Sequence, residues 1–118
     1  MAVITHGSSF GKPTVRAVLL SGEVATATGS WTNVEGFTIL VFETRGIDGA
    51  SGGTTVQIRG SNATGAAPGA TGGVQLGSDI TACGMTTLAT PIRYVKAMVT
   101  VYASGNTVGV RMFGRDNV

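Results

Sequence analysis

The stretch I-R-Y-V-K-A-M-V-T-V-Y-A, residues 92–103, decides the fold class of this chain. Val95, Ala97, Val99 and Val101 occupy alternate positions, with lysine, methionine and threonine between them and a tyrosine on either side. Successive side chains of a strand point to opposite faces of a sheet. The pattern therefore predicts a β-strand with one apolar face turned inward.

The strand that follows is predicted from turn chemistry and the same alternation. Residues 104–106, Ser-Gly-Asn, have the composition of a three-residue hairpin loop. Val108, Val110 and Met112 then recur at every second position, which predicts the inner face of a returning strand that ends near Gly114.

Further strands are predicted upstream of this pair. Residues 14–21 are rich in β-branched and aliphatic side chains, and residues 37–45 are apolar on both faces, as in a central strand. Residues 54–60 alternate, with Val56 and Ile58 facing inward. An Asp-Gly pair between these two strands is the strongest hairpin signal in the chain. Shorter strands are predicted at residues 24–28, 74–77 and 85–88.

No segment has the period of an amphipathic helix, so we predict an all-β fold. Roughly eight short strands favour an antiparallel β-sandwich, jelly-roll-like, in which residues 14–118 form a single domain. Residues 1–13 lack a sustained period and are predicted to be an extended N-terminal arm that either frays or lies across a neighbouring molecule. Residues 61–73, S-N-A-T-G-A-A-P-G-A-T-G-G, are predicted to be a long exposed loop, either a flexible tip or a contact surface.

Charge and composition narrow the function classes. Charged residues make up 12% of the chain, and such a weakly charged surface favours a protein that functions within an assembly. The eight Lys and Arg residues are scattered and the net charge is only +2, so we expect no nucleic-acid binding. The single cysteine fits folding in a reducing cytoplasm, and the N-terminus lacks a signal-peptide pattern. Because no apolar run is long enough to cross a bilayer, we expect no membrane association.

No set of side chains has the pattern of a catalytic or metal site. His6 is the only histidine, and it lies in the predicted arm, which cannot hold the geometry of a catalytic triad. Cys83 has no second histidine to activate it and is expected to be a small buried hydrophobe. A structural Ca²⁺ at Asp48 or Asp79 is a weaker alternative. We therefore expect no enzyme activity, no cofactor and no metal, since the carboxylates are dispersed at Glu23, Glu35, Glu43, Asp48, Asp79 and Asp116.

The aromatic residues and the arm supply the candidate partner contacts. Trp31 precedes the central strand and is expected to anchor the core, with ligand stacking as the alternative. Tyr94 and Tyr102 fall on one face of a predicted strand, together with a lysine and a methionine, which favours an oligomer contact over a carbohydrate platform. The full set of candidate contacts is Val3, Ile4, His6, Phe10, Lys12, Trp31, Tyr94 and Tyr102.

Five segments, taken in order, carry a resemblance to a known family. They are S-W-T-N-V-E-G-F from Ser30, T-V-Q-I-R-G-S-N from Thr55, L-G-S from Leu76, T-P-I-R-Y-V-K-A-M-V-T-V from Thr90 and T-V-G-V-R-M-F-G from Thr107. Together they look like the small jelly-roll β-sandwiches of tailed-phage structural proteins, which are similar in outline to galactose-binding-like, discoidin-type domains. The relatives usually carry Asp-Gly after the Ser-Asn pair, where this chain has Ala63-Thr64, and the departure argues against a ligand or ion at that turn.

The resemblance implies a virion component, and within that class a capsid decoration (cement) protein that binds the major capsid protein and stabilises the shell. Such proteins typically form symmetric clusters, so a homo-oligomer, most simply a homotrimer, is expected on the capsid surface after synthesis in the host cytoplasm. The arm would reach a neighbouring subunit or the capsid by adding a strand or an apolar plug. A carbohydrate-binding module and a fibre-associated or tail-associated domain are the alternatives.

Overall fold

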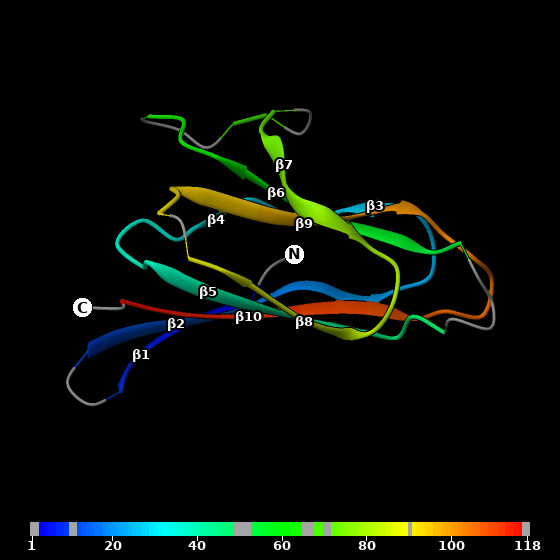
Figure 1. The fold of residues 1–118 in the computed structure, drawn as a ribbon, viewed down its shortest axis with the longest axis horizontal. Coiled ribbons are helices and arrows are strands. Elements are labelled where there is room, and N and C mark those ends of the chain that lie inside the picture. The colour runs from blue at the N-terminus through cyan, green and yellow to red at the C-terminus, as the bar shows by residue number, and fades with distance from the viewer. Residues whose placement is uncertain are drawn as a thin grey trace.

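The computed structural model describes residues 3–9, 12–48, 53–64, 68–69, 72–89 and 91–116, and these form two antiparallel sheets packed face to face (Figure 1). The predicted all-β sandwich is therefore confirmed. The strands are β1 (Val3–Ser9), β2 (Lys12–Glu23), β3 (Ala27–Thr28), β4 (Thr32–Asn33), β5 (Ile39–Arg45), β6 (Thr55–Ser61), β7 (Val74–Ile80), β8 (Gly84–Leu88), β9 (Tyr94–Val101) and β10 (Val108–Arg115).

The chain crosses repeatedly from one sheet to the other. Sheet A has the strand order β1-β2-β10-β5-β8, and sheet B has the order β3-β9-β6-β7, with the short β4 also paired to β9. Setting β1 and β4 aside, two four-stranded sheets remain in which most neighbours are distant in sequence, as in a jelly roll. The jelly-roll-like prediction is thus confirmed at the level of strand order.

The core lies between the sheets and consists of the inward-facing residues of alternating strands. Leu40 and Phe42 of β5 and Val95 and Val99 of β9 are all buried members of this core. Val101 was also predicted to face inward, but it is 51% exposed because it is the last residue of β9, at the rim of the sandwich. The predicted inner faces of β6 and β10 are confirmed by the burial of Val56, Ile58, Val108, Val110 and Met112.

The two hairpins predicted from turn chemistry are wrong. The strands flanking each turn, β5 and β6 in one case and β9 and β10 in the other, belong to opposite sheets. Side-chain hydrogen bonds, rather than the backbone ladder of a hairpin, stabilise these crossings. The Asn106 side-chain amide donates to the Thr54 hydroxyl, and the same hydroxyl accepts from the Ala103 backbone N–H at 2.8 Å. The Asn106 side chain also accepts the Asp48 backbone N–H at 2.7 Å, which ties the two crossings together.

The N-terminal segment predicted to be an arm is extended but paired. Residues Val3–Ser9 form β1, which pairs with β2 in continuous register from Val3 opposite Val18 to Ser9 opposite Lys12. β1 thereby becomes an edge strand of sheet A. Figure 1 shows the end of β1 and the start of β2 extending away from the other strands, at the lower left of the view. What the sequence pattern presents as an arm is thus an outer strand whose far end projects from the body.

Candidate functional site

The outer surface of sheet A combines arginines with exposed apolar side chains. The register places Arg16 of β2, Phe113 of β10 and Val41 of β5 side by side in one row across the strands. The next row holds Val18, Arg111, Glu43 and Met85 in the same strand order, continued onto β8. We refer to these residues together as the sheet A surface: Arg16, Val18, Val41, Glu43, Met85, Arg111 and Phe113.

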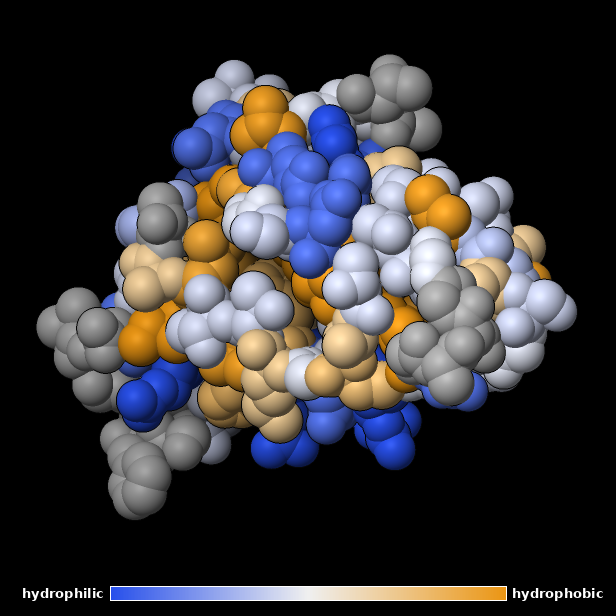
Figure 2. All heavy atoms as spheres, turned by 45° about the vertical axis from the view of Figure 1, so that its right-hand side comes forward, coloured by the Kyte–Doolittle hydropathy of each residue, from blue (hydrophilic) through white to orange (hydrophobic). Residues whose placement is uncertain are grey.

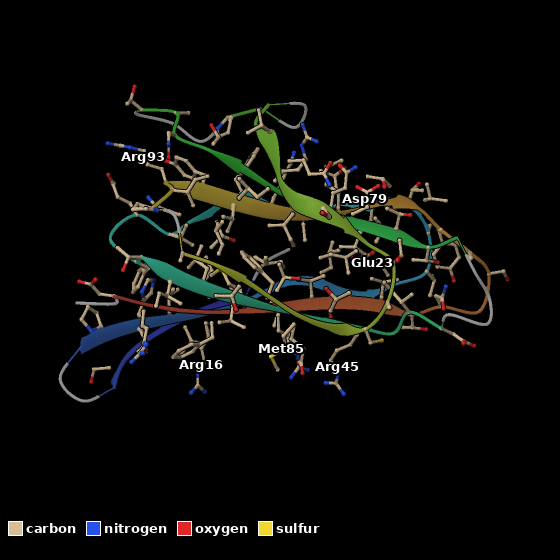
Figure 3. All side chains as sticks on the ribbon, viewed as in Figure 1. Arg16, Glu23, Arg45, Asp79, Met85 and Arg93 are labelled. Carbon is tan, nitrogen blue, oxygen red and sulfur yellow. The ribbon has the colours of Figure 1, made fainter. Side chains whose placement is uncertain are left out.

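These side chains line an open depression of about 520 Å³, which also reaches Thr5 of β1. Met85 is 70% exposed at its rim, and the Arg16 guanidinium lies over the Phe113 ring at 5.6 Å from the ring centroid. Figure 3 shows Arg16, Met85 and Arg45 all pointing away from sheet B, on the outward side of sheet A. An apolar floor with cationic walls is suited to a partner that brings both an apolar side chain and a carboxylate.

The charge on this side of the molecule is predominantly positive. Arg45 and Arg115 lie on the same face of their strands as Arg16 and Arg111, and both are exposed. Glu43 is the one carboxylate that the described strands place on this face. Figure 2 shows strongly hydrophilic residues along the lower margin, the side toward which sheet A faces, below a more apolar middle. Four of the six arginines, which look scattered in the sequence, are therefore gathered on one surface: Arg16, Arg45, Arg111 and Arg115.

Two described residues of the glycine-rich loop are bonded to side chains on the outer face of sheet B. The Trp31 indole N–H donates to the Gly69 carbonyl at 3.0 Å, and Arg59 donates to the Gly73 carbonyl at 2.9 Å. Gly73 has φ +84°, and a Cβ there would lie 2.6 Å from the Trp31 ring, so glycine permits this close approach. The described residues of the loop are thus held against the sheet.

Lys96 is buried beneath this cover. Its Nζ lies 4.6 Å from the centroid of the Trp31 ring, and its side chain is inaccessible to solvent although it points away from the core. Burial, with the nearby Arg59 guanidinium as a second cause, lowers the pKa of Lys96 from its usual 10.5. The indole thus helps to shield the Lys96 side chain from solvent.

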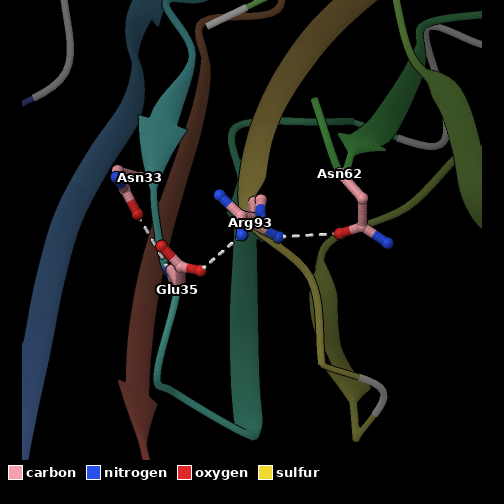
Figure 4. A network of polar contacts seen from close by, with 4 residues as sticks. All are labelled: Asn33, Glu35, Asn62 and Arg93. Carbon is pink, nitrogen blue, oxygen red and sulfur yellow. Dashed lines mark hydrogen bonds and ion pairs between the residues drawn. The ribbon is translucent and has the colours of Figure 1, made fainter. Parts of the chain in front are cut away.

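A polar network fixes the end of sheet B beside this cluster (Figure 4). Arg93 pairs with the Glu35 carboxylate at 3.1 Å, and its backbone N–H donates to the Asn62 side chain at 3.0 Å. Asn33 in turn accepts the Glu35 backbone N–H at 2.9 Å. These residues come from three of the five segments that carry the phage resemblance. Their contacts in this chain are structural, since they join the ends of β4, β6 and β9.

The predicted contact residues do not form one site. Trp31 is half-buried on the outer face of sheet B, which corrects its expected place in the core. Tyr102 lies beyond the end of β9, packs against the core and donates to the Asn106 carbonyl at 2.6 Å, so it does not share an aromatic strip with Tyr94. Tyr94 itself is half-buried on β9.

The contact residues of the predicted arm lie on or next to β1. Ile4 is 44% exposed, and the His6 ring is 6.3 Å from the Phe37 ring. Val3 and Lys12 occupy the paired backbone positions at the ends of the β1–β2 hairpin. Phe10 lies outside the described residues. The prediction that this segment contacts a partner stays a prediction.

Cys83 corrects another expectation. It is exposed in the turn between β7 and β8, and its thiol donates to the Ile47 carbonyl at 3.3 Å. Of the two acids considered for Ca²⁺, Asp79 accepts from the Gln57 and Gln75 side chains at 3.1 and 2.7 Å. Within the described ranges, no three His, Cys, Asp or Glu side chains lie close enough together to hold a metal ion, and no helix could span a membrane.

Sequence reasoning missed the sheet A surface. The sequence contains pairs of one arginine and one apolar residue two positions apart, such as Arg16 with Val18 and Arg111 with Phe113. Each pair by itself is typical of the solvent-facing side of any strand. Only the pairing of β2, β10, β5 and β8 places the pairs beside one another.

Comparisons with known proteins give distant structural likenesses and no family. No protein-family model matches the chain, and no curated protein matches it in sequence. The SPBc2 prophage-derived protein YomS is similar with a TM-score of 0.48 and 11% identity, over 98% of this chain and 96% of that one. A chain from the crystal structure of Drosophila melanogaster CENP-C bound to CAL1 is similar with a TM-score of 0.40 and 13% identity, over 96% of this chain and 80% of that one. Both likenesses are too distant to assign a function.

Proposed function

We propose that this chain is a structural protein of a phage virion, most simply a capsid decoration protein that binds the major capsid protein through the sheet A surface. The observation that carries the proposal is the open apolar depression flanked by arginines. The exposed Met85 lies beside the half-buried Phe113 and Val41, and apolar side chains grouped in this way support the proposal of a contact with another molecule.

The resemblance of the five segments to phage structural proteins suggests the major capsid protein as the partner, and the charge of the sheet A surface indicates which residues the partner should present. Arg16 and Arg111 flank the depression, so the partner surface is expected to carry Asp or Glu beside an aliphatic or aromatic side chain. A folded β-sandwich with a preformed surface loses little conformational entropy on docking, which favours a protein that stabilises a shell by many identical contacts.

The test is the presence of the chain in purified particles. Particles of the phage that encodes the chain are purified by density gradient, and the chain is quantified by mass spectrometry relative to the major capsid protein. We expect a fixed stoichiometric ratio that persists on heads separated from tails. Absence from the particles overturns the virion role, and presence on tails alone overturns the capsid assignment.

A pair of variants tests the surface itself. Val41→Asp with Phe113→Asp is expected to reduce incorporation about tenfold or more, because two carboxylates enter an apolar contact. Val74→Asp is the matched control, since Val74 is a 66% exposed valine on β7 of the other sheet and its incorporation should equal that of the wild type. Unfolding by urea shows whether each variant is folded. Incorporation of a folded double variant at the wild-type level excludes the sheet A surface as the docking face.

The carbohydrate-binding alternative has less support. It requires aromatic rings exposed on a sheet face or loop end. One face of the Trp31 ring is occupied by Lys96, and the Tyr102 hydroxyl is bonded to the Asn106 carbonyl. A saturable glycan-array signal that is lost in Trp31→Ala would favour this alternative.

A further inference from the structure

The free edge of β1 is the least protected strand edge in the described part of the molecule. β1 is the first strand in the order of sheet A, and no described strand pairs with its other side. It has seven residues and contains no Lys, Arg, Asp, Glu or Pro. Its ladder with β2 has no register shift, so no bulge twists the strand away from solvent. An edge of this kind presents unpaired backbone N–H and C=O groups to any second strand.

The other edge strands are shorter than β1 or have an interrupted ladder. β3 has two residues and β8 has five. β7 is as long as β1, but its ladder with β6 is interrupted by a register shift. It also contains Gly77 at φ +72° and the exposed carboxylate of Asp79. Short length, bulges and charge each discourage pairing with another molecule, and β1 has none of the three.

We propose that a second copy of this chain pairs with β1 through this free edge, so that two sheets A join into one continuous antiparallel sheet across a twofold axis. The occupant follows from the chemistry of the edge. A strand without Lys, Arg, Asp or Glu brings none of these charges against its own copy, and an identical edge is available on every molecule. Figure 1 shows β1 at the margin of sheet A, as the strand order requires.

The arrangement also has a consequence for the sheet A surface. Thr5 of β1 belongs to the lining of the depression, so pairing through β1 places two depressions on one continuous face. A partner with repeated identical subunits would then be held at two points, which raises the avidity without any new contact. The self-association nevertheless concerns the chain alone, and its test needs no virion partner.

The first test is the oligomeric state of the purified chain in sedimentation equilibrium. We expect a dimer in the wild type. Ile4→Lys, at a 44% exposed position of β1, is expected to weaken dimerisation about tenfold or more by adding a charge to the edge. Val74→Lys places the same charge at a 66% exposed valine on β7 and should dimerise like the wild type.

The second test needs no substitution and therefore does not depend on the folding of a variant. Alternate backbone amides of an edge strand lack a partner and exchange quickly with solvent. Hydrogen exchange measured below and above the dimer concentration should show protection gained in β1 and no change in β7 or β8.

A wild-type monomer at every concentration overturns the proposal, as does a dimer that persists in Ile4→Lys. A trimer, which the phage resemblance implies, also overturns it, because an edge-to-edge contact across a twofold axis closes on two copies. A dimer without incorporation into particles would refute the proposed virion role while leaving this inference intact.

Discussion

Gly46 stands where the chain leaves β5, and replacing it with alanine gives a sharp test of the crossing between the sheets. Its φ is +80°, and an added Cβ would lie 1.6 Å from the Thr107 carbonyl oxygen and 2.6 Å from the carbonyl carbon. The Thr107 N–H donates to the Gly46 carbonyl at 3.2 Å, so the two backbones are already held together. Backbone atoms cannot rotate away as a flexible side chain can, so the crossing itself must move.

The expected cost has two parts. A left-handed backbone costs an alanine about 1–2 kcal/mol. Forcing extra volume into a packed region costs about 1–3 kcal/mol more, so Gly46→Ala should lower the free energy of unfolding by about 2–5 kcal/mol. Gly36→Ala is the matched control, because Gly36 has φ +93° with nothing within 4 Å of the added Cβ. Gly36→Ala should lower the free energy of unfolding only by the cost of the left-handed backbone, about 1–2 kcal/mol.

Both variants are measured by urea unfolding, followed by the fluorescence of the single tryptophan and by circular dichroism. Coincident transitions from the two probes establish that a two-state analysis applies. The reasoning is refuted if Gly46→Ala and Gly36→Ala lose the same stability within about 0.5 kcal/mol, the usual range of surface effects. The backbone approach to Thr107 would then have no energetic consequence.

Three further predictions concern the outer face and end of sheet B. Trp31→Ala removes the bond to the Gly69 carbonyl and should make the loop at residues 61–73 cleave faster in limited proteolysis, whereas unchanged cleavage would contradict the proposed pinning. Because burial lowers the pKa of Lys96, the unfolded chain binds more protons at this group between the lowered value and 10.5. The stability of the wild type relative to Lys96→Met should therefore rise with pH toward 10.5 in urea unfolding, and a flat difference counts against burial of the charge. Glu35→Gln should cost at most about 1 kcal/mol and less at high salt, because its pair with Arg93 is exposed to solvent; a loss of about 3 kcal/mol would mean that the network is cooperative.

Much of the fold could be predicted because the alternation that indicates a strand is visible within a short stretch of sequence. Alternation at residues 92–103 and 54–60 gave strands β9 and β6 within two residues and identified Val95, Ala97 and Ile58 as core. The hairpins failed because turn composition reports only the turn. Whether the next strand returns in the same sheet depends on distant partners such as Thr54 and Asn106.

The candidate site was harder to predict than the fold. Trp31 was expected in the core because a lone tryptophan is usually buried. It lies instead on the outer face of sheet B, where its ring contacts Lys96 and its N–H donates to the Gly69 carbonyl. Cys83 was expected to be buried because free cysteine usually is, but its turn leaves it exposed. In both cases the residue type gave an average preference, and the surrounding elements decided the outcome.

The sequence by itself determined that this chain is all-β, that its charge is low, and which residues in the middle of its longer strands face inward. Those properties depend on a period of two along a single strand and on composition. The tertiary structure alone decided that β1 is an open edge, and that Arg16, Arg111, Phe113 and Met85 share one surface. The physical reason is that strand pairing is non-local: the residues lining that depression come from β1, β2, β5, β8 and β10, and no local pattern encodes which strands become neighbours.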